Sequence, residues 1–229
     1  LSLSNLRKLF KSKPNYKFIS NDKCKHELWV IENKDKKLKV QKYLNKINKI
    51  YICDGHHRLQ AMLKSKKKIS PMIVAFPDQQ VEILDYNRVI KSNLSFKQIH
   101  NIISKSFSIK IKNTKKLKKN EIGMYTNNKW YIIKYLKKSK DLNITILKKF
   151  IIDKILKNKK NIKYVSGIKG DVILKKLVNS GKFNVAFKLN PTNLLQVISF
   201  AEKKKYMPQK STWFHPKPLD GLILSKVIS

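Results

Sequence analysis

The segment 54–58, with the sequence DGHHR, combines the residue types that bind and transfer phosphate. An apolar run precedes it at 50–53 and a helix-like stretch follows at 59–67, so the pattern predicts a strand, a glycine turn and a helix N-terminus. The first backbone N–H groups of a helix lack intrahelical partners and carry the positive end of its dipole. We therefore expect the Gly55 turn and Arg58 to hold phosphate oxygens.

Each remaining polar side chain of this segment offers a chemical role. Either His56 or His57 can donate a hydrogen bond or move a proton at a transferring group. Asp54 can orient a histidine or ligate Mg²⁺. The alternative is a capped turn in which Asp54 accepts helix N–H groups and the other side chains are solvated. Neighbouring histidines diverge on a turn, so we expect no zinc site, and we expect neither haem nor flavin.

Three further segments carry candidate binding groups. Arg88, within 85–88, offers a second planar fork for phosphate, or else belongs to a surface strand of alternating polarity. The loop 207–217 mixes hydroxyls, cations and aromatic rings between prolines, and its candidate phosphate-binding residues are Lys210, Ser211 and Thr212. The alternative for this loop is a structural crossover whose rings fill the core. His26 and Trp29 could stack on a base or a ribose, although a lone tryptophan is often a core residue.

The formal net charge is +38, and nearly all of the positive charge is lysine. Lysine, asparagine and isoleucine share A/T-rich codons, so genomic base composition explains this excess more simply than an evolved affinity for nucleic acid. The lysines are spread along the chain rather than gathered in one stripe, and non-specific binding to polyanions follows in either case. The arginines are few, at positions 7, 58 and 88, which favours a specific need for the guanidinium fork.

Other features of the composition bound the class of protein. Two cysteines, Cys24 and Cys53, are too few for a disulfide framework and do not form a C-x-x-C pair. No run of about 18 apolar residues is present, so no membrane span is predicted. The chain begins with Leu1 and shows no signal peptide. We expect a cytoplasmic protein that is an internal fragment or a truncated product.

The periodicity of apolar residues predicts a mixed α/β fold in two parts, 1–110 with the DGHHR segment and 111–229 as a C-terminal α/β subdomain. The predicted strands are 26–31 and 38–40 as a hairpin, 50–53, 71–76, 81–90, 122–126, 130–135, 162–165, 185–189 and 222–227. The predicted helices are 3–11, 40–47, 59–67, 96–104, 145–156, 171–180 and 192–203.

Several strings also resemble, in order, the motifs of one family, domain of unknown function 1015. Residues 51–58 resemble its YIADGHHR signature, with Cys53 where alanine is usual. The other matching segments are 26–29, 85–89, 123–125, 130–131, 164–170, 185–187, 207–217 and 220–222, so the resemblance covers roughly 17–228. Gln209 replaces the second proline of an MPPKST string, and a long leading segment of the family is expected to be missing.

The family signature is similar to the phosphate-binding glycine turn of the ParB and sulfiredoxin superfamily. This resemblance implies a ParB/sulfiredoxin-like mixed sheet in which residues 55–58 hold the phosphates of ATP or ADP with Mg²⁺ and Asp54 supports them. It implies a nucleotide-binding protein, and in full-length relatives a small-molecule kinase of the free-serine-kinase type whose partners are a nucleotide and a small-molecule acceptor. The alternatives are a ParB-like, nucleotide-gated DNA-binding module and a truncated, inactive family member.

Overall fold

The computed structural model describes residues 12–65, 71–112, 116–156 and 161–225, and the contacts between Cα atoms divide the chain into two units. The first unit runs to Gln80 and takes in the end of the chain from Leu224, and the second runs from Val81 to Ile223. The division into 1–110 and 111–229 as functional parts stays a prediction.

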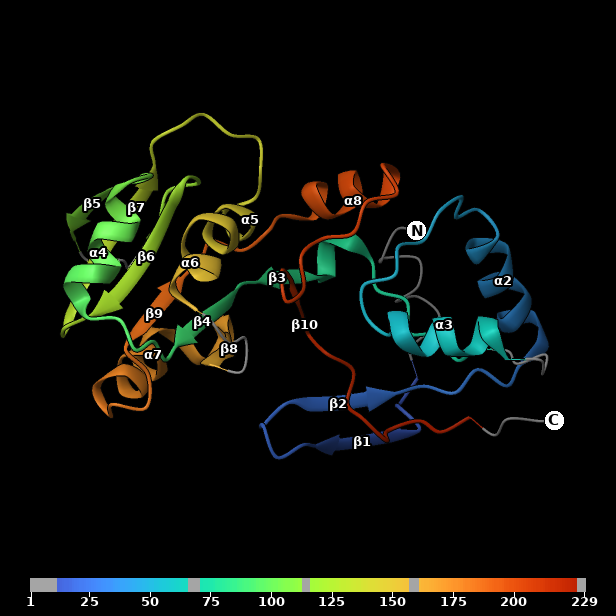
Figure 1. Ribbon diagram of the computed structural model, residues 1–229. Helices are drawn as coiled ribbons and strands as arrows, with labels where there is room; N and C mark the ends of the chain where they lie inside the picture. The colour runs from blue at the N-terminus through green and yellow to red at the C-terminus, as the bar shows by residue number, and fades with distance from the viewer. Residues whose placement is uncertain (1–11, 66–70, 113–115, 157–160, 226–229) are drawn as a thin grey trace. The chain divides into compact units, whose positions relative to one another are not determined.

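A six-stranded antiparallel sheet forms the centre of the second unit (Figure 1). Its strands, in spatial order, are β5 (Phe107–Ile111), β7 (Lys129–Tyr135), β6 (Glu121–Thr126), β9 (Val185–Lys188), β4 (Tyr86–Ile90) and β8 (Ile162–Ser166). A separate two-stranded sheet pairs β3 (Glu82–Leu84) with β10 (Trp213–His215). The prediction of a mixed α/β fold is confirmed.

Helices cover both faces of the six-stranded sheet. They are α4 (Phe96–Ser104), α5 (Asn143–Leu147), a π-helical turn (Lys148–Ile152), α6 (Asp153–Ile155) and α7 (Gly170–Asn179). A further helix, α8 (Leu194–Glu202), has no buried residue. Leu174 of α7 packs with Val89, Tyr125 and Ala186 in one cluster of buried side chains. A larger cluster on the other face takes in side chains of α4, α5, the π-helical turn and α6. Within the described residues, no helix combines the length and apolarity needed to cross a membrane.

Local sequence signals account for several of these elements. Ser95 and Gln98 form a capping box at α4, in which the Gln98 N–H donates to Ser95 Oγ at 3.3 Å and the Ser95 N–H donates to Gln98 Oε1 at 2.8 Å. Asn127 and Asn128 take positive φ values of 47° and 59° in the turn between β6 and β7. Asparagine tolerates this conformation, and the twist of such a turn suits a tight hairpin.

The first unit contains the hairpin β1 (Tyr16–Ile19) and β2 (Lys25–Leu28), followed by α2 (Lys34–Leu44) and α3 (His56–Lys64) (Figure 1). The predicted hairpin of 26–31 with 38–40 is therefore wrong. Asn33 starts a helix instead of a turn, because its side chain accepts the Lys36 N–H at 3.0 Å.

The predicted strands 50–53 and 71–76 are also wrong, because neither segment pairs with a strand of the described residues. Strand propensity takes effect only where a neighbouring strand supplies the hydrogen bonds and covers the side chains. Here the apolar side chains of both segments stay largely exposed.

In the second unit, most predicted elements are found within a few residues of their expected bounds. The predicted strand 81–90 is divided at Asp85 into β3 and β4, while β5 and β10 had no sequence prediction. Residues 222–225 are not a strand, and the rest of that predicted strand lies outside the described residues, as does the predicted helix 3–11.

Removal of the α4 cap should cost measurable stability. We expect Ser95→Ala to lower the free energy of unfolding by about 1 kcal/mol, because one N-terminal N–H of the helix loses its acceptor. Ser104→Ala, at the exposed end of the same helix, should change it by less than about 0.5 kcal/mol. Urea unfolding followed by circular dichroism measures both, and equal losses would contradict the role of the cap.

Candidate functional site

Gly55 shapes the turn that starts α3. Its backbone is left-handed, with φ 83° and ψ 17°, and it occupies the N-cap position. Asp54 Oδ1 accepts the Gly55 N–H at 2.9 Å, which stabilises the turn from the preceding residue. Gly55 has no side chain to cap the helix, so the first-turn N–H groups receive no acceptor from the N-cap residue. These donors suit an anion.

Arg58 folds back over this turn. A Cβ built on Gly55 would lie 3.3 Å from Arg58 Nη2 and 3.5 Å from Arg58 Nε, so the guanidinium covers the glycine. Arg58 is exposed. A planar cation next to the start of a helix places two kinds of N–H donor and two sources of positive potential at one point.

The other members of the segment are accessible. Asp54, His56 and His57 are all exposed. Burial, and secondarily the charge of Asp54, raise the pKa of the neighbouring Cys53 thiol, so this thiol is a poor nucleophile. In the part of the chain that the structure describes, no cluster of three or more His, Cys, Asp or Glu side chains could hold a metal ion. A Mg²⁺ at Asp54 would therefore depend on ligands from a bound molecule.

Arg88 is placed in the interior, where it is 2% exposed, so the surface-strand interpretation is wrong. Its Nη1 donates to the Tyr86 carbonyl and its Nη2 to the Lys210 carbonyl at 2.7 Å, and the guanidinium lies 5.5 Å from the centre of the Tyr164 ring. Burial lowers the pKa of Arg88 to about 10. Phosphate binding by Arg88 stays a prediction, and it would require donors that the two carbonyls do not occupy.

Asp85 is the first residue of the segment 85–88 (the DYNR motif) and lies between β3 and β4, and it was not among the predicted site residues. Its Oδ2 atom is buried and has no hydrogen-bond partner among the described residues, and burial raises the pKa of this carboxyl. Gly167 approaches so closely that a Cβ there would clash with Asp85 Oδ1, and the Gly167 N–H donates to the Asp85 carbonyl at 2.9 Å. Nearby, Lys188 pairs with Asp171 at 2.8 Å.

The candidate residues of the loop 207–217 lie near β3, β4 and β10. Lys210 Nζ lies 5.4 Å from the centre of the Tyr86 ring, and Lys217 Nζ lies 4.8 Å from that of Trp213. Ser211 is buried and its Oγ donates to the Pro208 carbonyl. The loop thus places two lysines against aromatic faces. The Ser211 hydroxyl donates its proton to a backbone carbonyl, so this donor is already used within the protein.

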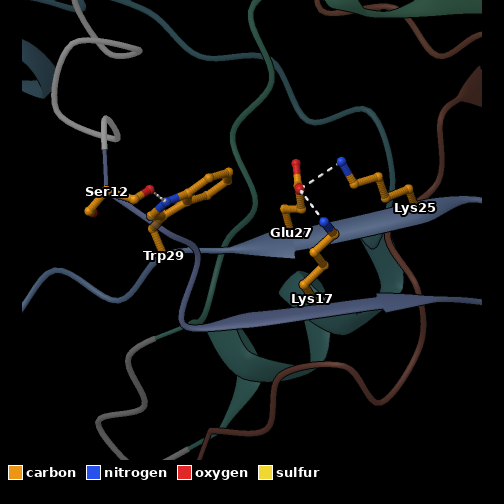
Figure 2. Close-up of polar contacts among 5 residues, drawn as sticks. All are labelled: Ser12, Lys17, Lys25, Glu27 and Trp29. Carbon is orange, nitrogen blue, oxygen red and sulfur yellow. Dashed lines mark hydrogen bonds and ion pairs between the residues drawn. The ribbon is translucent and has the colours of Figure 1, made fainter.

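His26 and Trp29 belong to the hairpin unit, and protein neighbours already contact both rings. Trp29 Nε1 donates to the Ser12 carbonyl at 2.9 Å (Figure 2). The His26 ring stacks on Phe18 with centroids 4.9 Å apart, and its Nε2 lies 2.9 Å from Ser20 Oγ. Figure 2 also shows a carboxylate of β2 between two lysines of the hairpin. Base stacking by either ring stays a prediction.

The predicted site residues therefore fall into two groups, one in each unit. The first holds the turn 54–58 and the hairpin rings, and the second holds Arg88 with the side chains at 210–212. Two buried members of the second group, Arg88 and Ser211, were predicted from the sequence, whereas the buried Asp85 was not. The alternation of polar residues in 85–88 was the available signal, because it places them on opposite faces of a strand.

The pH dependence of stability should reveal the buried Asp85 carboxyl. A raised folded-state pKa means that the folded chain binds this proton more tightly than the unfolded chain, so stability falls as pH rises from about 4 through the folded pKa. Asp85→Asn removes the carboxyl, so we expect it to lose this pH dependence. The free energy of unfolding of the wild type, relative to that of the variant, should therefore be lower at pH 7 than at pH 4. Urea unfolding across that range measures it, with exposed Asp141→Asn as control. The same pH trend in both variants would contradict this assignment.

Substitution of Gly55 by alanine should change both the stability of the fold and its stabilisation by phosphate. Gly55→Ala and Gly181→Ala should each destabilise the fold by about 1 kcal/mol, because both glycines have positive φ. Stabilisation by inorganic phosphate should fall in Gly55→Ala alone, because nothing lies within 4 Å of a Cβ at Gly181 whereas Arg58 meets the one at Gly55. Thermal unfolding with and without phosphate measures both effects. Equal phosphate responses in the two variants would argue against an anion site at the turn.

Solved structures include several that are similar to part of this chain. One solved structure, a conserved hypothetical protein from Pyrococcus furiosus, is 19% identical, with a TM-score of 0.46 over 71% of this chain and 68% of that one. Free serine kinase in complex with AMP is 16% identical, with a TM-score of 0.46, and a variant of it in complex with ADP is 15% identical, with a TM-score of 0.45. The match spans 66% of each free serine kinase chain, just under two thirds.

No curated protein matches the chain. The model of the family described as "Protein of unknown function (DUF1015)" matches residues 3–161, which is more than half of the sequence. The chain therefore belongs to the DUF1015 family.

Proposed function

We propose that this chain binds the phosphate groups of a nucleotide, ATP or ADP with Mg²⁺, at the turn 54–58. One observation carries the proposal: the left-handed Gly55 starts α3 while the guanidinium of Arg58 covers the same turn. Backbone donors and a planar cation then converge on one exposed place, which is the arrangement that phosphate oxygens require.

Each residue of this turn has its own role in the proposed binding of phosphate. Arg58 forms a bidentate contact with phosphate oxygens, and the N–H groups of His56 and His57 face the same oxygens from the helix start. Asp54 stabilises the turn by accepting the Gly55 N–H, and its carboxylate would be a ligand of Mg²⁺. The ion's other ligands come from the nucleotide and from water.

In full-length relatives, the proposed reaction is that of a small-molecule kinase of the free-serine-kinase type. The terminal phosphoryl group passes from the nucleotide to a hydroxyl of the acceptor, and the hydroxyl proton leaves to His56 or His57. Both imidazoles are exposed beside the proposed phosphate position, which supports this role. Catalysis of this kind rests on positioning and on neutralising charge at the phosphates.

The predicted site residues of the second unit are treated separately from the turn 54–58. Lys210, Ser211 and Thr212 would form a phosphate-binding group of their own within the second unit. Their support is the density of cations and hydroxyls in the loop 207–217. We further propose a cytoplasmic location, where nucleotide and acceptor are both available.

A thermal-shift series tests the phosphate site on the full chain. ATP, ADP, CTP and GTP are added with Mg²⁺ to wild type, Arg58→Ala and Lys64→Ala. Ligand at about 100 times its dissociation constant should add roughly 2.7 kcal/mol to the folded state. We expect Arg58→Ala to lose most of this shift and Lys64→Ala to keep it, because Lys64 is an exposed cation at the other end of the same helix.

Measurements at two salt concentrations distinguish a specific phosphate site from the non-specific attraction of anions to a chain of net charge +38. Non-specific polyanion binding weakens steeply as salt rises, so the Arg58-dependent shift is measured at both low and high ionic strength. Absence of any shift in the wild type, or equal losses in the two variants, would rule out the phosphate site.

A further inference from the structure

A groove with a volume of about 310 Å³ lies in the second unit, and its lining contains none of the predicted site residues. Three segments of the chain meet there, namely the residues just before β6, those just before α5, and α8. A volume at the lower end of the range for ligand pockets suits a small molecule.

Contacts within the fold hold these three segments together. Asn143 Nδ2, at the start of α5, donates to the Lys119 carbonyl at 2.8 Å. Asn190 Nδ2, ahead of α8, donates to the Lys118 carbonyl at 2.5 Å. Phe200 of α8 packs against the larger cluster of buried side chains. The walls of the groove are therefore fixed by the fold.

The charged side chains of the lining are all cations. Lys119, Lys140 and Lys203 line the groove and are exposed, and none of the three forms an ion pair with another described residue. Among the described residues, no Asp or Glu lines it. Glu121, close to Lys119 in sequence, instead accepts the Lys118 N–H at 2.8 Å. The positive charge at the groove is therefore not compensated within its lining.

Two amide side chains add neutral donors to this lining. Asn193 Oδ1 accepts the Gln196 N–H at 2.8 Å, and Gln196 Oε1 accepts the Asn193 N–H at 3.0 Å. Because this capping box uses the amide oxygens, the NH₂ groups are the parts left to meet a ligand. The polar side chains of the groove therefore present mainly donors, which select a ligand rich in acceptors.

We propose that this groove binds a small organic anion in which phosphate or carboxylate groups are attached to an apolar part. The ammonium and amide donors meet the anionic oxygens. The apolar part meets Leu142, Leu195 and Phe200, which also line the groove. The inference goes beyond the proposed nucleotide site, because it concerns another unit and uses neither 54–58 nor 210–212.

A nuclear magnetic resonance titration of the full chain tests this inference with defined probes. Phenyl phosphate and isophthalate carry acidic groups on an aromatic ring, inorganic phosphate lacks the apolar part, and benzyl alcohol lacks the charge. At about 0.15 M salt, where screening weakens general attraction, we expect at least one of the two aromatic anions to shift the amide resonances of 118–120 and 193–203. It should bind at least about fivefold more tightly than inorganic phosphate, and benzyl alcohol should not bind. The two aromatic anions distinguish phosphate from carboxylate as the preferred group.

Two lysines of one loop provide a matched pair of variants. Lys140→Glu reverses a charge in the lining and should weaken binding of the preferred aromatic anion about tenfold. Lys138→Glu makes the same change at an exposed lysine that is not among the lining residues, and should alter the affinity by less than about twofold. Arg58→Ala should leave binding at the groove unchanged, so that this result is separate from the test of the phosphate site.

Three results would overturn the inference. The first is the absence of resonance shifts at the groove with both aromatic anions. The second is an equal loss of affinity in Lys140→Glu and Lys138→Glu, which would show attraction by overall charge alone. The third is binding of inorganic phosphate or benzyl alcohol as tight as that of the aromatic anions.

Discussion

The buried guanidinium of Arg88 is the constraint on which the architecture of the second unit depends. A cation taken out of water costs several kcal/mol unless its donors are satisfied, and here backbone carbonyls satisfy them. One of these carbonyls belongs to Tyr86 on the same strand, and the other belongs to Lys210, 122 residues away in sequence. The Arg88 guanidinium also contacts the ring of Tyr164, which belongs to β8. Displacement of the loop 207–217 would therefore leave a buried charge without its partner.

The rest of the DYNR motif extends this arrangement to both faces of β4. Successive side chains of a strand point to opposite faces, so Asp85 and Asn87 lie on one side while Tyr86 and Arg88 lie on the other. Asn87 Oδ1 accepts the Leu189 N–H at 3.1 Å, and the ring of Tyr86 meets that of Trp213 edge-on at 5.4 Å. The polar residues of this motif thus connect β4 to segments far away in sequence. These contacts are made within the protein, whereas His56, His57 and Arg58 of the turn 54–58 are exposed.

The sequence predicted the second unit well because its signals there are local. The Ser95 cap and the Asn127-Asn128 turn each specify one backbone conformation, and the structure contains both. The first unit was predicted poorly because its signals depend on partners. Val and Ile at 50–53 and 71–76 indicate strands only if another strand lies beside them, and no described strand does. The strand β10 was missed because its three residues lie in a proline-rich loop and gain their partner, β3, from tertiary structure.

The same limit explains why sequence alone treated Arg58 and Arg88 alike. Both are rare arginines in motif strings, and the planar fork suits phosphate at either position. Their neighbours differ, however. Arg88 is followed by Val89 and Ile90, which are fully buried, so an arginine in this strand must satisfy its charge inside the protein. Arg58 stands in the first turn of a helix after a left-handed glycine, where its donors stay in water. Burial and the two carbonyl contacts give Arg88 a structural role, and of these two arginines Arg58 is the one whose side chain is exposed.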